Sequence, residues 1–134
     1  MRDPVLEWLD REECFRLLGS VPIGRVGLSM SALPVVLPVR FALLDDDVVF
    51  RTAIGTRLYE AATEAVIAFE ADHHDPNGMG GWSVLVQGRS EEVTDAGELA
   101  RAHALGVAPW TRDDAADRFI RIASTVVSGR RFTP

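Results

Sequence analysis

Apolar residues recur in short runs along most of the chain, and Gly, Pro, Asp and Asn residues separate the runs. From Pro22 onward these runs have the length and the Val, Ile and Leu content of β-strands. The pattern predicts strands over residues 23–29, 34–44, 47–52, 65–73, 82–93 and 118–124. Asp45 and Asp46 form a hairpin turn between the second and third strands. We expect residues 1–8 to form an irregular arm and the residues after Ser124 a short tail.

Two segments carry the capping box that begins a helix, an Asp followed three residues later by a Glu. Asp10, with Glu13 after it, begins a helix that runs to Leu18. Asp95 begins another helix in the same way. A third, shorter helix follows the third strand and ends near Ala62.

Pro34 and Pro38 lie within the second predicted strand, where each removes a backbone donor from the sheet. This strand therefore needs an edge, a bulge or an irregular start, which an open or split barrel supplies. Consecutive strands that are mostly neighbours, with a few short helices, predict a mainly β fold, a small six-stranded antiparallel barrel. The sequence contains no repeat and no second core, so residues 1–134 are expected to form a single domain.

The composition narrows the class of protein. The net charge is −6, whereas a general nucleic-acid binder needs a basic stripe. The only cysteine, Cys14, rules out an intramolecular disulfide and a cysteine-rich zinc site. No apolar run approaches the roughly 20 residues that span a bilayer, and Asp3 argues against a secretory signal. We expect a cytoplasmic protein with neither a nucleic-acid nor a membrane partner.

The end of the third predicted strand carries the most informative polar residues, Arg51, Thr52, Thr56 and Arg57. They bring together two guanidinium groups, two hydroxyls and the start of a helix, whose free N–H groups attract anions. Because Arg makes charge-assisted hydrogen bonds, the set suits a phosphate monoester. The spacing alone fits equally well a surface helix that Thr56 caps, with both arginines in solvent.

The segment Asp72–Asp75 contains two histidines and two aspartates, residue types that bind metals. Adjacent strand residues point to opposite faces, so His73 and His74 bind one ion only if the strand turns between them. We therefore expect no metal site.

Seven short segments, spread over nearly the whole chain, carry a likeness to known proteins. They are Leu9–Cys14, Ile23–Val26, Leu37–Val39, Val49–Leu58, Ala68–Asp72, Gly81–Gly88 and Ser128–Arg131. In this order and spacing they resemble the pyridoxamine 5′-phosphate oxidase-like, FMN-binding split-barrel family, particularly its short single-domain members. The resemblance implies a split β-barrel of the FMN-binding type that forms a homodimer with its flavin sites at the interface.

The resemblance also implies which residues hold the cofactor. They are Arg51, Thr52, Thr56 and Arg57 at the FMN phosphate, Val39 and Arg40 along the isoalloxazine ring, and Trp82 and Ser83 from the partner subunit. Trp82 and Ser83 are neighbours on one strand, so both reach the ring only if the strand is bulged at its start. Otherwise Trp82 is a core or interface anchor and Ser83 an exposed polar residue.

The implied function is that of an oxidoreductase that transfers a hydride between FMN and a small organic substrate or a nicotinamide. No catalytic residue is assigned, since the sequence shows no acid–base motif and the cofactor carries the hydride chemistry. Two alternatives stay open. A reductase of the same fold could use the deazaflavin coenzyme, with Arg25, Arg40 and Arg89 near its acidic tail. A non-catalytic carrier or sensor could bind flavin or haem.

Overall fold

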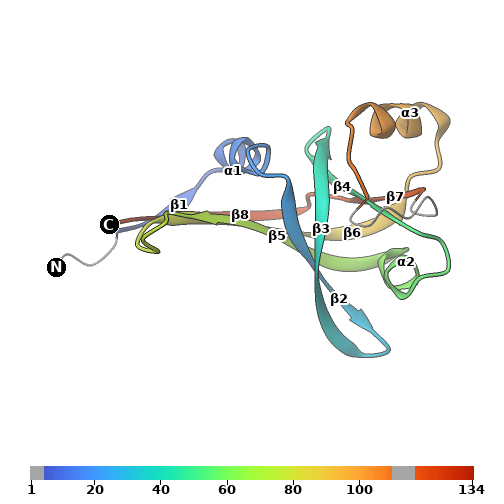
Figure 1. The fold of residues 1–134 in the computed structure, drawn as a ribbon, viewed down its shortest axis with the longest axis horizontal. Helices are drawn as coiled ribbons and strands as arrows, with labels where there is room; N and C mark the ends of the chain where they lie inside the picture. The colour runs from blue at the N-terminus through green and yellow to red at the C-terminus, as the bar shows by residue number, and fades with distance from the viewer. Residues whose placement is uncertain (1–4, 110–116) are drawn as a thin grey trace.

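The computed structural model describes residues 5–109 and 117–134, which form eight strands and three helices (Figure 1). The elements are β1 Val5–Leu9, α1 Arg11–Leu18, β2 Ile23–Met30, β3 Leu33–Leu44, β4 Asp47–Thr52, α2 Arg57–Ala62, β5 Ala65–His74, β6 Gly81–Glu92, α3 Ala96–Ala104, β7 Arg118–Ile122 and β8 Val126–Thr133. Within the described residues, no helix has the length and apolar character that crossing a membrane requires.

Strands β2 to β7 form a closed antiparallel barrel. Neighbouring strands follow the order β6-β5-β2-β3-β4-β7, and β7 pairs back with β6. Closure is possible because β6 changes partner along its length. Its residues Gly81–Gln87 pair with β8, and Ser90–Glu92 pair with β7. These six strands are the predicted ones, so the mainly β fold with a six-stranded antiparallel barrel is confirmed.

A two-stranded extension continues the sheet beyond the barrel (Figure 1). β8 pairs with β6, and β1 pairs with β8, with Leu9 opposite Gly129. The predictions of an irregular arm over residues 5–8 and of a short tail after Ser124 are therefore wrong, while residues 1–4 lie outside the described residues. Most side chains of β1 are exposed, so its stability comes from backbone pairing with the other end of the chain rather than from a buried face.

The main core fills the barrel and continues under α1. Its fully buried side chains include Phe50, Phe69 and Val84. As predicted, Asp10 caps α1, because its carboxylate accepts a hydrogen bond of 2.8 Å from the backbone N–H of Glu13. Cys14 of α1 is fully buried against Gly129 of β8, where a larger side chain would collide with its sulfur. Helix α1 therefore covers the inner side of the extension.

A smaller core lies beneath α3, where Val49, Ala102 and Phe119 are buried together. Asp95 caps this helix as predicted, accepting a hydrogen bond of 2.9 Å from the N–H of Glu98. Helix α3 thus covers the side of β4 that faces away from the barrel interior.

Gly88 lies where β6 leaves β8 and turns toward β7, and a Cβ built on it would stand 1.8 Å from the carbonyl oxygen of Ala123. Because backbone must move to make room, we expect Gly88→Ala to lower the free energy of unfolding by about 2–3 kcal/mol. Gly19→Ala is the control, since its Cβ would meet no atom closer than 3.6 Å. Urea unfolding of both variants checks this, and equal stabilities would contradict it.

Candidate functional site

The structure brings the hydroxyls of Thr52 and Thr56 together at the end of β4. The two oxygens are 3.2 Å apart. Thr56 Oγ1 donates to the carbonyl of Ala53 at 2.7 Å and accepts from the N–H of Tyr59 at 3.1 Å, which caps α2. Because a hydroxyl has one proton, Thr52 is the donor in the contact between the two threonines. Both protons are used within the chain, and a bound anion would receive them only after the hydroxyls rotate.

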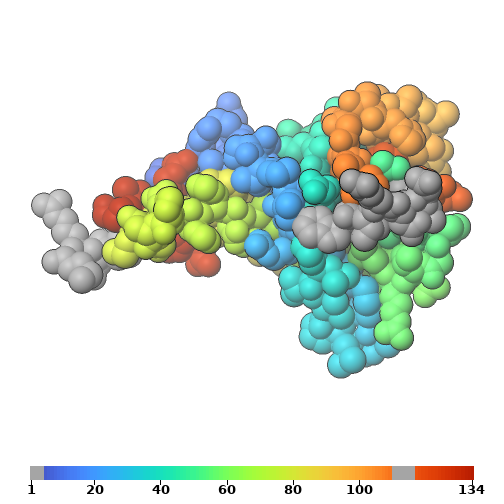
Figure 2. Space-filling model, in the orientation of Figure 1, coloured from blue at the N-terminus to red at the C-terminus, as the bar shows by residue number. Residues whose placement is uncertain are grey.

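Arg57 follows Thr56 directly and is the first residue of α2, with its side chain exposed. It borders a groove of about 280 Å³ that α2 forms with the tip of the β2–β3 hairpin, near Met30 and Ser31. Figure 2 shows this tip and α2 side by side. Arg57 is therefore an exposed cationic side chain directly after Thr56 in the chain, and its contact with a phosphate stays a prediction.

Arg51 lies on the opposite side of β4 from Thr52. Thr52 shares the barrel face with Phe50, whereas Arg51 shares the other face with Val49, beneath α3. Its guanidinium donates to the carbonyl of Val107 at 3.2 Å and lies 5.2 Å from the centre of the Phe119 ring. Its buried Nε has no hydrogen-bond partner among the described residues. The structure does not bring Arg51 to the hydroxyl pair, and its contact with a phosphate stays a prediction.

On β3, Val39 and Arg40 point to opposite sides. Val39 is buried in the barrel core, and Arg40 is exposed opposite Ile23 of β2. A ring lying along this strand would therefore meet its backbone and its outward side chains.

Trp82 and Ser83 do not share a face. β6 pairs with β5 without interruption from Gly81 to Ser90, so the bulge that would turn both residues to one ligand is absent. Trp82 packs against the main core, and Ser83 points outward. Ser83 accepts a hydrogen bond of 3.4 Å from Nε of Arg130.

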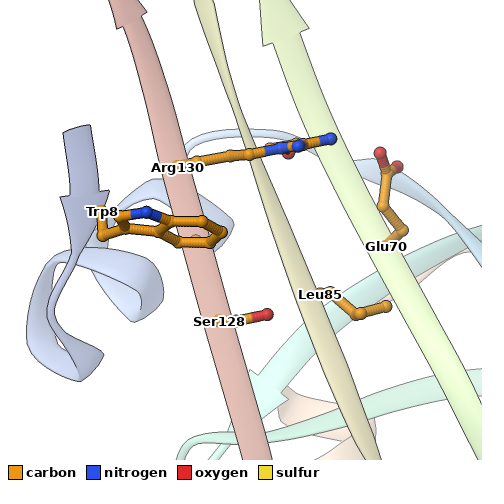
Figure 3. A pocket seen from close by; sticks show the side chains of 7 residues that line it. Trp8, Glu70, Leu85, Ser128 and Arg130 are labelled. Carbon is orange, nitrogen blue, oxygen red and sulfur yellow. Dashed lines mark hydrogen bonds between the residues drawn. The ribbon is translucent and has the colours of Figure 1, made fainter. Parts of the chain in front are cut away.

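The outward side of β1, β8, β6, β5, β2 and the first half of β3, called here the outer face, carries residues that sequence reasoning missed beside the predicted Ser83. One row across it runs from Trp8 through Arg130 and Ser83 to Asp72. The next row holds Ser128, Leu85, Glu70 and Arg25. Between the rows lies a cleft of about 320 Å³, lined by Trp8, Glu70, Ser83, Leu85, Ser128, Gly129 and Arg130 (Figure 3). Its residues come from four strands, two of them in the extension, so no local motif reveals it.

Glu70 is the titratable group at the centre of the outer face. Its partial burial, and then its interaction with the Asp72 carboxylate, raise its pKa from 4.5 to about 7. The guanidinium of Arg25 opposes this rise, lying 3.0 Å from a Glu70 oxygen and 3.4 Å from Asp72. One arginine is thus shared between two carboxylates, and Glu70 exists in both protonation states near neutral pH.

The outer face is also rich in exposed apolar side chains. Val66 is 76% exposed, and Trp8 and Val36 are each 68% exposed. Several exposed apolar side chains on one side of a sheet are typical of an interaction surface.

Comparison with known proteins identifies the family. The family model described as "Pyridoxamine 5′-phosphate oxidase" matches residues 10–131. Protein Rv0080 of Mycobacterium tuberculosis is 38% identical over 128 residues, which cover 92% of this chain and 83% of that protein. The chain therefore belongs to the pyridoxamine 5′-phosphate oxidase family, as the sequence resemblance predicts.

Two solved structures extend the similarity to the whole fold. The FAD-binding protein from Mycobacterium smegmatis has a TM-score of 0.82 and 36% identity, and the match covers 97% of this chain and 99% of that chain. An FAD-binding protein from Mesorhizobium loti has a TM-score of 0.75 and 27% identity, with 95% and 98% covered.

The variant Glu70→Gln removes the carboxyl group whose pKa is raised on the outer face. The folded protein keeps a proton on Glu70 up to about pH 7, whereas the unfolded chain loses it near the ordinary pKa of 4.5. Stability therefore falls as the pH rises from about 4.5 to 7. We expect Glu70→Gln to unfold at a higher temperature than the wild type at about pH 8 and at the same temperature at about pH 4, measured by circular dichroism. A difference that does not change with pH would contradict this assignment.

Proposed function

We propose that this protein binds a flavin nucleotide and works as a homodimer with the flavin at the interface. The observation that carries the proposal is the chain-length match to the M. smegmatis protein, which is named as FAD-binding. Our expectation from the sequence is FMN, and FAD shares the phosphate and the ring that the site would hold. A cytoplasmic location is part of the same proposal.

The phosphate of the flavin would lie beside Thr52, Thr56 and Arg57. The residues fit this group, because two hydroxyls stand 3.2 Å apart and the exposed Arg57 follows Thr56 directly in the chain. Rotation of either hydroxyl exchanges an internal hydrogen bond for one to a phosphate oxygen, so binding costs the chain no unpaired donor. The guanidinium of Arg57 adds a charge-assisted hydrogen bond and balances the charge of the anion.

The ring would lie along β3 between Val36 and Arg40, where outward side chains and backbone form one wall. Ser83 of a second copy would reach it from the other side, since Ser83 points outward from β6. A bound flavin supplies hydride transfer, and we propose that the protein is an oxidoreductase acting on a small molecule. Of the three arginines that could meet the acidic tail of a deazaflavin, Arg25 is already paired with Glu70 and Asp72. This favours FMN or FAD.

The second copy would pack on the outer face. Its exposed valines and Trp8 form an apolar surface of the kind that homodimers bury, and aromatic residues are common in such interfaces. Trp82, our interface anchor from the sequence, packs against the core in this structure, and Trp8 lies on the outer face. We expect light scattering to give the mass of a dimer, and a monomeric mass well above micromolar concentration would contradict this.

The variants Arg57→Ala and Arg51→Ala measure separately how much each arginine of the predicted phosphate site contributes to flavin binding. A charged hydrogen bond contributes about 1.5–3 kcal/mol, so we expect Arg57→Ala to weaken flavin binding about 10- to 100-fold. Arg51→Ala should weaken it less, because its guanidinium is engaged with Val107 on the far side of β4. Titration of FMN and FAD by flavin fluorescence measures both. A greater loss in Arg51→Ala, or no loss in Arg57→Ala, would contradict this placement of the phosphate.

A further inference from the structure

The groove between α2 and the tip of the β2–β3 hairpin has a volume of about 280 Å³ and lies beside the proposed phosphate position. Met30 at this tip packs against the main core, so it lies on the side of β2 away from the outer face. The groove is therefore outside the surface that a second copy would cover. It is lined by Ser29, Met30, Ser31, Arg57, Glu60 and Ala61.

The α2 residues of the groove share one side of the helix. Glu60 and Ala61 follow Arg57 by three and four positions, the spacing that brings helical side chains next to one another. Arg57 and Glu60 are both exposed, so each can turn toward a ligand. This wall of the groove thus offers a cationic donor and an anionic acceptor beside the small side chain of Ala61.

The hairpin gives the groove a second wall of fixed shape. Its two turn residues, Ser31 and Ala32, have φ angles of 51° and 65°. A two-residue turn with positive φ at both positions favours Asn-Gly, and residues with a Cβ adopt this conformation at a cost. Backbone strain of this kind is typical of binding sites. Met30 directly before the turn adds a thioether, which packs well against aromatic rings.

The side chains of the groove match the adenosine end of a dinucleotide. A guanidinium binds phosphate, a carboxylate accepts hydrogen bonds from ribose hydroxyls, and a thioether packs on a flat base. The volume is just below the roughly 300 Å³ at which small-molecule sites begin, which suits one part of a cofactor rather than a whole flavin. Because Arg57 follows Thr56 directly, the groove begins at the residue beside which the flavin phosphate would lie.

We propose that this groove binds the adenosine end of FAD, so that the chain prefers FAD to FMN. The inference rests on the proposed function, which places the flavin phosphate beside Thr56 and Arg57. Arg57 then contacts the pyrophosphate, Glu60 accepts hydrogen bonds from the ribose, and Met30 packs on the adenine. FMN lacks the ribose and the adenine, so its affinity does not depend on Glu60 or Met30.

Calorimetric titration with FAD, FMN and ADP tests this preference. We expect FAD to bind at least tenfold more tightly than FMN. Glu60→Ala removes the acceptor for the ribose and should weaken FAD about tenfold without changing the affinity for FMN. Met30→Ala should lower the affinity for FAD in the same selective way. Glu12→Ala is the matched control, since Glu12 is an exposed glutamate on α1 and does not line the groove.

ADP carries the adenosine end without the flavin, so it separates this inference from the flavin proposal. A ratio of FAD to FMN affinity that falls in Glu60→Ala and Met30→Ala but not in Glu12→Ala supports the groove. Equal affinities for FAD and FMN in the wild type, or a ratio that neither variant changes, overturn it. If neither flavin binds, the flavin proposal falls and ADP decides. ADP binding that weakens in Glu60→Ala but not in Glu12→Ala supports an adenosine site, and no ADP binding at millimolar concentration overturns it.

Discussion

Closure of the barrel through β6 is the constraint on which the rest of the structure depends. This strand pairs with β5 along most of its length, with β8 at its beginning and with β7 at its end. Gly88 permits the change of partner, because the backbone of Ala123 lies where a side chain would be. The part of β6 that belongs to the extension therefore presents one side to α1 and the core and the other side to the outer face. The cleft, Glu70 and the exposed apolar residues all lie on that second side.

The two regions of chemical interest differ in how the chain builds them. The hydroxyl pair of Thr52 and Thr56 is local, since a single turn joins the end of β4 to the cap of α2. The cleft is not local, because strand register alone brings Trp8 beside Arg130 and places Ser83 next to Arg130. The first offers anion contacts and the second offers a stacking surface with a donor and an acceptor. We propose that the first of these regions contacts the phosphate of a flavin.

The same difference explains what the sequence could predict. Periodic apolar runs indicated all six barrel strands, and the caps at Asp10 and Asp95 were evident from their spacing. β1 and β8 have little buried alternation and are stabilised by pairing between distant parts of the chain, which no local pattern reports. The sequence places Thr52 and Thr56 four residues apart at the end of β4, and the structure shows their hydroxyls 3.2 Å apart. Alternation along a strand places Trp82 and Ser83 on opposite sides unless the strand is bulged. The uninterrupted pairing of β6 with β5 shows that β6 has no bulge at these two residues. Trp8, Glu70 and Arg130 escaped notice because only the register of the sheet joins them.

The central claim is that flavin binds between two copies of this chain that meet at the outer face. Flavin affinity measured over a range of protein concentrations, together with the mass of the complex, tests it most directly. We expect one flavin per chain in a dimer, and a flavin affinity that falls as dilution separates the copies, because a site made of two chains is linked to their association. Flavin that binds a monomer with the same affinity at every protein concentration would contradict it.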